Sequence, residues 1–160
     1  MALRSRKRES AAPEPIGPVR LLVVHDDTEG CELLVRVLSG AGYPVDRAHD
    51  HEQMSDALAN SPTCVVLDVS SSGFGGNLKL LDTVRHHAVP RVANCRVVLI
   101  GTGTSSAMFS WQAGIDGFLR RPFHADDLIA TVAEAITRPD DDRKPHRRRM
   151  VEAARIGERA

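Results

Sequence analysis

The feature of this sequence that most constrains its fold is the alternation of short apolar runs with segments of helical periodicity. Five runs predict β-strands, at residues 19–24, 43–48, 64–68, 96–100 and 117–121. After each run, apolar residues recur at intervals of three or four, as on one face of an amphipathic helix. The runs are nearly continuous in hydrophobic residues, which is typical of strands buried on both faces. We therefore expect an α/β fold, a doubly wound five-stranded parallel sheet with helices on both sides.

The chain of 160 residues is long enough for one domain with its own core. We place that domain at residues 19–137. Residues 1–18 are basic and rich in proline, so we expect a disordered arm there. Residues 138–160 carry eight basic and five acidic side chains, and we expect a charged tail whose last residues could form a short helix. Limited proteolysis should then remove both ends and leave the melting temperature of the body unchanged.

The composition excludes several classes of protein. No apolar stretch reaches the roughly 18 residues of a membrane span, and the basic N-terminus lacks the apolar region of a signal peptide. We therefore expect a cytoplasmic protein with no membrane contact. The three cysteines are widely spaced, which indicates neither a disulfide framework nor a zinc site. Nucleic-acid binding by the basic ends is not expected, because acidic residues dilute their charge and no aromatic residues are interleaved.

Charged and polar residues follow the apolar runs at one edge of the predicted sheet. In chain order these residues are His25, Asp26, Asp27, Asp68, Thr102 and Arg121. Sites in doubly wound folds form beyond the carboxyl ends of the strands, so we expect these side chains to lie close together. The alternative is that Asp68 is a solvated acid at the end of a strand.

Clustered carboxylates repel one another unless a cation lies among them, and Mg²⁺ suits such a cluster because it prefers oxygen ligands. A carboxylate beside Mg²⁺ can attack a phosphoryl group and form an aspartyl phosphate. Asp68 is the best candidate for this role, because the small residues that follow it, SSSGFGG, leave room for a phosphate. The hydroxyl of Thr102 and the charge of Arg121 could neutralise the phosphoryl oxygens.

Several motifs in register resemble the receiver domain of bacterial response regulators. VVHDD is similar to the acidic pair after that family's first strand, and VVLDVSSSGFGG to its phosphoacceptor strand and loop. WQAGIDGFLRRPF is similar to the segment in which the family has a lysine before a proline and a phenylalanine, and implies a cis bond between Arg121 and Pro122. The resemblance covers residues 19–137 and implies a flavodoxin-like sheet with strand order 2-1-3-4-5.

The resemblance also implies roles for individual residues. Asp68 becomes the phosphoacceptor, assisted by Thr102 and Arg121. Asp26, Asp68 and the backbone carbonyl of Ser70 become the ligands of Mg²⁺. Asp27 then matches a common third acid that is not a ligand.

Three departures from the family pattern bear on that site. His25 replaces the first acid of the pair, which removes one negative charge and implies weaker Mg²⁺ binding. The alternative for His25 is an ordinary hydrogen-bonded histidine at the end of a strand. Arg121 replaces an almost obligatory lysine, keeping the charge on a bulkier, planar group. The position of the switch hydroxyl stays open, because strict continuation of the strand puts Gly101 there and Thr102 one residue later.

The leading hypothesis is a stand-alone receiver domain that accepts a phosphoryl group on Asp68 from a sensor histidine kinase, a phosphotransfer protein or a small phosphodonor. It would not be an enzyme, beyond catalysing its own phosphorylation and dephosphorylation. Its output would be contact with an unidentified protein, through the face formed by the fourth helix, the fifth strand and the fifth helix. The alternative is a degenerate pseudo-receiver that binds a partner independently of phosphorylation, and the substitutions at His25 and Arg121 favour it.

Overall fold

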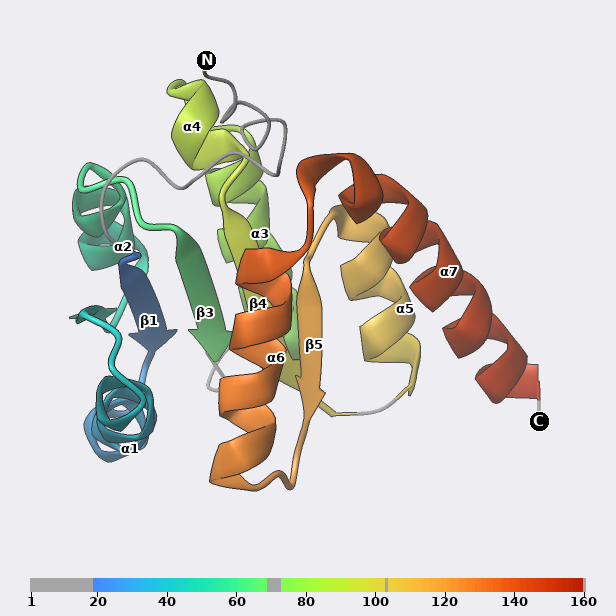
Figure 1. Cartoon of the computed structure of the whole chain (residues 1–160), viewed down its shortest axis with the longest axis horizontal. Helices are drawn as coiled ribbons and strands as arrows, with labels where there is room; N and C mark the ends of the chain where they lie inside the picture. The colour runs from blue at the N-terminus through green and yellow to red at the C-terminus, as the bar shows by residue number, and fades with distance from the viewer. Residues whose placement is uncertain (1–18, 69–72, 103, 160) are drawn as a thin grey trace, which may run out of the picture.

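Five parallel strands form one sheet in the computed structural model, which describes residues 19–68, 73–102 and 104–159. The strands are β1 (Leu21–His25), β2 (Val45–Ala48), β3 (Cys64–Asp68), β4 (Arg96–Gly101) and β5 (Gly117–Arg120). They pair in the order β2-β1-β3-β4-β5, with every pair parallel (Figure 1). The expected fold class and strand order are confirmed, and each strand begins and ends within two residues of its predicted position.

Helices cover both faces of the sheet. They are α1 (Thr28–Gly40), α2 (His51–Leu58), α3 (Gly73–Arg85), α4 (Pro90–Ala93), α5 (Thr104–Ala113), α6 (Ala125–Thr137) and α7 (Asp140–Arg159). Buried residues of α1 and α6 pack on one face, and buried residues of α2, α3 and α5 pack on the other. The single turn α4 and the long helix α7 were not expected from the sequence.

The central strands are buried on both sides, as their composition predicts. In β1, Leu21 and Val23 face the core beneath α1 and α6, whereas Leu22 and Val24 face the opposite core. Each of these four side chains is at most 1% exposed. Burying one such side chain contributes roughly 1.5–3 kcal/mol, so packing on both faces fixes β1 firmly in the sheet. The carboxyl ends of β1 and β3 are therefore a rigid platform for the residues that follow.

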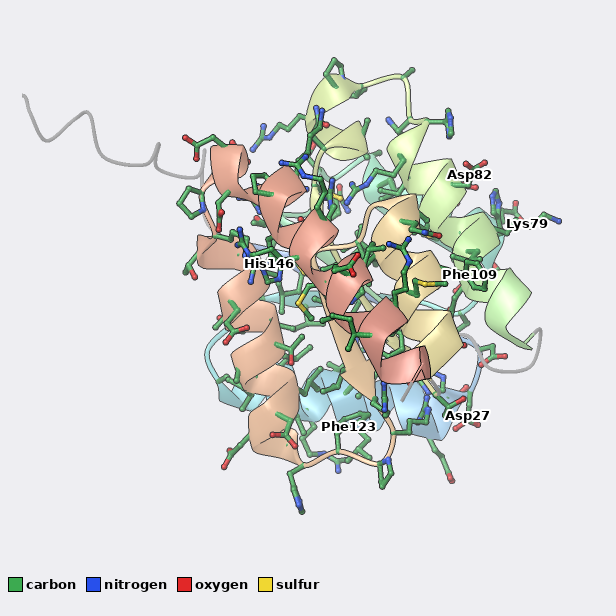
Figure 2. The ribbon with its side chains drawn as sticks, turned by 90° about the vertical axis from the view of Figure 1, so that its right-hand side faces the viewer. Asp27, Lys79, Asp82, Phe109, Phe123 and His146 are labelled. Carbon is green, nitrogen blue, oxygen red and sulfur yellow. The ribbon has the colours of Figure 1, made fainter. Side chains whose placement is uncertain are left out.

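The C-terminal segment corrects the prediction for residues 138–160. We expected a charged tail after Thr137 with at most a short helix, but α7 is a helix of 20 residues. It packs along α5, where Figure 2 shows it lying across the body of the molecule. The ring of His146 meets the ring of Trp111 in α5 edge to face, with the ring centres 5.3 Å apart. Met150 and Val151 also pack against the core, so α7 is part of the folded body.

A buried carboxylate anchors α7. Asp116, the residue before β5, has a side chain only 1% exposed, and its two oxygens accept hydrogen bonds from three arginines. Arg143 and Arg147 of α7 donate to Oδ1 at 2.8 Å and 3.1 Å, and Arg85 of α3 donates to Oδ2 at 3.0 Å. Burial alone would raise the pKa of this carboxyl, but the hydrogen bond and charge of Arg143, with the charges of the other arginines, outweigh it and lower the pKa.

Candidate functional site

The site lies at the edge of the sheet toward which the strands point. Asp68 ends β3 and pairs in register with His25, which ends the neighbouring strand β1. Both side chains are buried, that of Asp68 being 3% exposed and that of His25 8%. Asp27 and Phe123, from the loops beyond β1 and β5, lie at this same lower end in Figure 2. The first and third strands therefore bring an acid and an imidazole together, as the sequence analysis expected for their carboxyl ends.

The hydrogen bonds of His25 fix which ring nitrogen carries its proton. The backbone N–H of Asp27 donates to Nδ1 of His25 at 3.0 Å, so Nδ1 is an acceptor and the proton of the neutral ring lies on Nε2. Nε2 lies 3.3 Å from Oδ2 of Asp68. The contact of 3.6 Å between Nδ1 and Oδ1 of Asp26 is consequently not a hydrogen bond. His25 thus places its protonated ring nitrogen beside Asp68.

Arg121 engages the other oxygen of the same carboxylate. Its guanidinium Nη2 donates to Oδ1 of Asp68, while its backbone N–H donates to the carbonyl of Gly101 at 3.0 Å. The Arg121–Pro122 peptide bond is cis, which confirms the implication of the sequence motif. The Arg121 side chain is 39% exposed, whereas that of Asp68 is buried. The structure therefore places Arg121 on Asp68, whereas its role toward phosphoryl oxygens stays a prediction.

The remaining predicted site residues are placed differently. Thr102 is exposed, and the structure joins it to Asp68 by no contact among the residues it describes. The ring of Phe118 fills the space beside Gly101, where an added Cβ would lie 3.3 Å from Cζ. Asp26 lies beside the His25 ring, and Ser70 falls outside the described residues. In the resting geometry the site consists of Asp68, His25 and Arg121, with Asp26 at its border.

Asp27 has a structural role that accounts for one of the consecutive acids. Its carboxylate accepts a hydrogen bond of 2.7 Å from the backbone N–H of Gly30, which caps the N-terminus of α1. The same residue orients His25 through its own backbone N–H. This agrees with the implied assignment of Asp27 as an acid that is not a metal ligand.

Gly30 makes room for the imidazole. A Cβ added to Gly30 would lie 2.4 Å from Nε2 of His25 and 2.7 Å from Cε1, far inside any acceptable contact distance. The histidine in β1 and the glycine in α1 are therefore sterically coupled. A histidine followed five positions later by glycine is a signal that sequence reasoning could have used, but it was missed.

Replacing Gly30 with alanine is expected to destabilise the protein by about 1–3 kcal/mol, because the new methyl group must displace the His25 ring. The free energy of unfolding in urea measures this effect. In the background of His25→Ala the same substitution should cost much less, since only the contact with Oδ2 of Asp27 at 3.2 Å remains and alanine favours a helix over glycine. Gly40→Ala, at a position with no atom within 4 Å of the added Cβ, is the control and should not destabilise. An equal cost of Gly30→Ala in both backgrounds would disprove the coupling.

Sequence reasoning also missed a buried amide near this edge. Asn77 of α3 is 5% exposed, and its Nδ2 lies 3.5 Å from the carbonyl of Ile100 near the end of β4. An asparagine directly before the leucines of a predicted helix (NLKLL, residues 77–81) was the available signal. Asn77 links α3 to the strand end beside the site.

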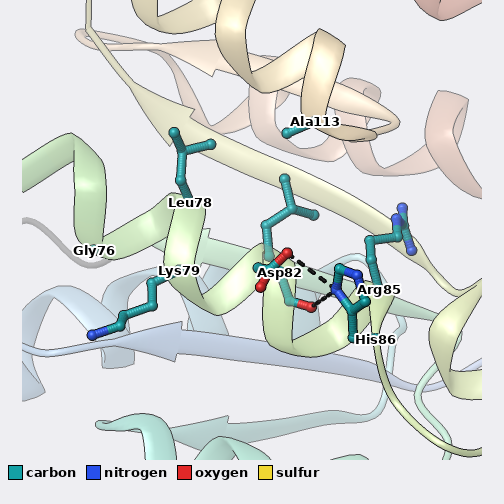
Figure 3. Close-up of a pocket in the computed structure, with 8 residues that line it drawn as sticks. Gly76, Leu78, Lys79, Asp82, Arg85, His86 and Ala113 are labelled. Carbon is teal, nitrogen blue, oxygen red and sulfur yellow. Dashed lines mark hydrogen bonds and ion pairs between the residues drawn. The ribbon is translucent and has the colours of Figure 1, made fainter.

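A hollow between α3 and α5 lies away from these residues. It has a volume of about 750 Å³ and is lined by Gly76, Leu78, Lys79, Leu81, Asp82, Arg85, His86 and Ala113 (Figure 3). His86 is held there by Asp82, whose Oδ1 lies 3.1 Å from its Nδ1. Neither Asp68 nor its partners line the hollow, so it is not part of the candidate site.

The fold and this edge define a flavodoxin-like domain with a buried acid at the end of its central strand. Residues 21–133 match the response regulator receiver domain. The chain is 33% identical over 132 residues to the response regulator MprA of Mycobacterium sp. (strain KMS), covering 80% of this chain and 55% of that protein. The receiver domain of NtrX from Brucella abortus superposes with a TM-score of 0.62 at 26% identity, covering 72% of this chain and 97% of that one.

A further solved structure, the chemotaxis response regulator CheY4 of Vibrio cholerae, has the same fold, with a TM-score of 0.62 at 19% identity over 74% of this chain and 99% of that one. The protein belongs to the response regulator receiver family. It spans about half the length of the curated relative MprA. Over the described ranges, no helix is long and apolar enough to cross a membrane.

Receiver domains generally bind Mg²⁺ at the phosphorylation site, but the residues described here do not fit that ion in their present arrangement. Oδ1 of Asp68 already accepts a hydrogen bond from Arg121, and Nε2 of His25 lies 3.3 Å from Oδ2. A protonated Nε2 cannot ligate a cation, and Mg²⁺ requires oxygen ligands in near-octahedral array. Within the described residues, no group of three or more histidine, cysteine, aspartate or glutamate side chains is arranged to hold a metal.

Proposed function

We propose that this protein is a signalling domain that accepts a phosphoryl group on Asp68. The observation that carries the proposal is the setting of that carboxylate. It is buried at the end of the strand beside β1, is fixed by register opposite His25, and is paired with the cation of Arg121. Membership of the receiver family supports the same role.

The chemistry follows from what each group can contribute. The Asp68 carboxylate is the nucleophile toward phosphorus, and a sensor histidine kinase, a phosphotransfer protein or a small phosphodonor supplies the phosphoryl group. The guanidinium of Arg121 offers several N–H donors in one plane and can follow the oxygens of the incoming group. Thr102 would have to move inward to contribute its hydroxyl. Apart from its own phosphorylation and dephosphorylation we propose no enzymatic reaction.

The output of the domain would be contact with another protein. The expected surface comprised the helices now labelled α5 and α6 and the strand β5. Because α7 packs on α5 through Trp111 and His146, part of that surface is covered by the chain itself. A partner would therefore meet α6 and the outer side of α7 rather than a bare α5.

The second candidate function is a pseudo-receiver that binds its partner constitutively. One observation favours it, namely that both oxygens of Asp68 are already engaged, by His25 and Arg121. A carboxylate held in this way is shielded from a donor unless Arg121 moves aside.

Treatment of the full chain with phosphoramidate, followed by intact-mass measurement, tests the proposal. One added phosphoryl mass is expected, and Asp68→Asn should abolish it while leaving the fold intact, since the change is nearly isosteric. Asp46→Asn is the control, because Asp46 is a partly exposed acid of β2 paired with Arg20, and it should be modified like the wild type. A wild-type protein that never gains mass would favour the pseudo-receiver, and phosphate persisting in Asp68→Asn would place the acceptor elsewhere.

A further inference from the structure

His25 occupies the side of Asp68 on which a cation would be expected. Its Nε2 lies 3.3 Å from Oδ2 of Asp68, and the residue as a whole is 7% exposed. This nitrogen carries the proton of the neutral ring, because Nδ1 is already used as an acceptor from the Asp27 backbone. A donor therefore stands at the position where the family pattern has an acid that attracts a metal.

The imidazole cannot easily turn away or change its tautomer. The Asp27 N–H holds Nδ1 at 3.0 Å, and this bond would be lost if the proton moved to Nδ1. On the other side the ring lies against Gly30, where even a methyl group would clash. The backbone carbonyl of His25 is in turn bonded to Nδ1 of His49 at 3.0 Å. His25 is thus a preorganised donor, fixed by two neighbouring segments.

The charges of the site point in the same direction. Asp68 already has the full positive charge of Arg121 on Oδ1, and His25 stands where the family pattern has an acid, with the Asp26 carboxylate beside its ring. A divalent cation would meet one guanidinium and one N–H donor in place of an additional carboxylate. Fixed donors aimed at developing negative charge are what stabilises a phosphoryl group in transit.

We infer that this site takes a phosphoryl group on Asp68 without a divalent cation, with the Nε2–H of His25 and the guanidinium of Arg121 as the donors that hold the phosphoryl oxygens. The inference rests on the proposed phosphorylation of Asp68. With phosphoramidate, an oxygen of Asp68 forms the bond to phosphorus and the phosphorus–nitrogen bond breaks. The nitrogen, already protonated in the donor at neutral pH, leaves as ammonia, so no further proton or electron is needed.

The test compares the full chain with phosphoramidate in excess EDTA and in millimolar Mg²⁺, following the intact mass with time. We expect the wild type to gain one phosphoryl mass at initial rates that differ by less than twofold. His25→Asp restores the acid of the family pattern and should react at least tenfold faster with Mg²⁺ than with EDTA. His87→Asp, in the loop between α3 and α4, is the matched control: its carboxylate can still accept from the N–H of Val89, and its reaction should not depend on Mg²⁺.

A measurement of Mg²⁺ binding tests the inference independently of phosphorylation. Calorimetric titration of the wild type with Mg²⁺ should show no binding at millimolar concentration, whereas His25→Asp should bind. A wild type that reacts only with Mg²⁺, or binds it as tightly as His25→Asp does, would overturn the inference and leave the proposed function standing. A wild type that reacts in neither condition would remove the proposed function itself, and with it the inference. Circular dichroism verifies that each variant is folded.

Discussion

Replacing Asp116 with alanine is expected to lower the free energy of unfolding by about 3–5 kcal/mol, because it leaves buried guanidinium groups without their counter-charge. Arg85, Arg143 and Arg147 all converge on this carboxylate, which also accepts a hydrogen bond of 3.0 Å from the N–H of Val97. A domain of this size is commonly stable by only about 5–15 kcal/mol, so much of the total would be lost. Urea denaturation followed by circular dichroism measures the change.

Asp142→Ala on the same helix is the matched control. Asp142 also pairs with an arginine, Arg149, at 3.4 Å, but both side chains are about half exposed. Exposed pairs of this kind contribute about 1 kcal/mol or less, so the control should be nearly neutral. If Asp116→Ala proved as mild as Asp142→Ala, the cluster would not be what fixes α7.

The same carboxylate gives a pH dependence with a definite sign. Because the folded protein lowers the pKa of Asp116 from its ordinary value of 3.8, the stabilisation is complete above that value and is lost as the pH falls through the lowered pKa. The free energy of unfolding of the wild type should therefore fall as the pH is lowered through this range. Asp116→Asn, which does not titrate, should lack that part of the acid sensitivity.

Removal of residues 138–160 is expected to lower the melting temperature by roughly 10 °C, the equivalent of about 3 kcal/mol for a domain of this size. The truncation takes away two of the three arginines on Asp116 and exposes apolar surface that Met150 and Val151 cover. Trp111 is the only tryptophan of the chain, so its fluorescence should shift to the red as its contact with His146 is lost. Differential scanning calorimetry and fluorescence spectra provide the two measurements.

A shorter truncation after Arg155 is the control. It removes the exposed Ile156 and the residues beyond it, which lie past the contacts with Asp116 and Trp111. Its melting temperature and fluorescence should match those of the full chain. If the truncation after Thr137 left the melting temperature unchanged, the predicted domain boundary at residue 137 would be correct and α7 would not contribute to the stability of the fold.

Much of the fold could be predicted from local pattern alone. Near-continuous apolar runs such as CVVLD need both faces of the strand to be buried, and two layers of helices provide this burial. The runs therefore predict a parallel, doubly wound sheet. The convergence of His25, Asp68 and Arg121 follows from that topology, because parallel strands present their carboxyl ends at one edge. These conclusions depend on periodicity and chain order, and both are properties of the sequence.

The missed features depend on contacts between distant segments. The arginines of residues 138–160 suggested a solvated tail, but Arg143 and Arg147 lie four residues apart on one face of α7 and meet Asp116 from another part of the chain. A charged side chain counts as polar in any pattern, and only its partner decides whether it can be buried.

The sequence by itself determined the parallel sheet and the acid at the end of a buried strand through its hydrophobic periodicity, and the strand order through its resemblance to the receiver family. Only the tertiary structure decided how that acid is held. The proton on Nε2 of His25 is fixed by the backbone N–H of Asp27, the space for the ring is provided by Gly30, and Thr102 is exposed. Such hydrogen-bond directions and steric limits act over a few ångströms between residues that the chain order does not bring together.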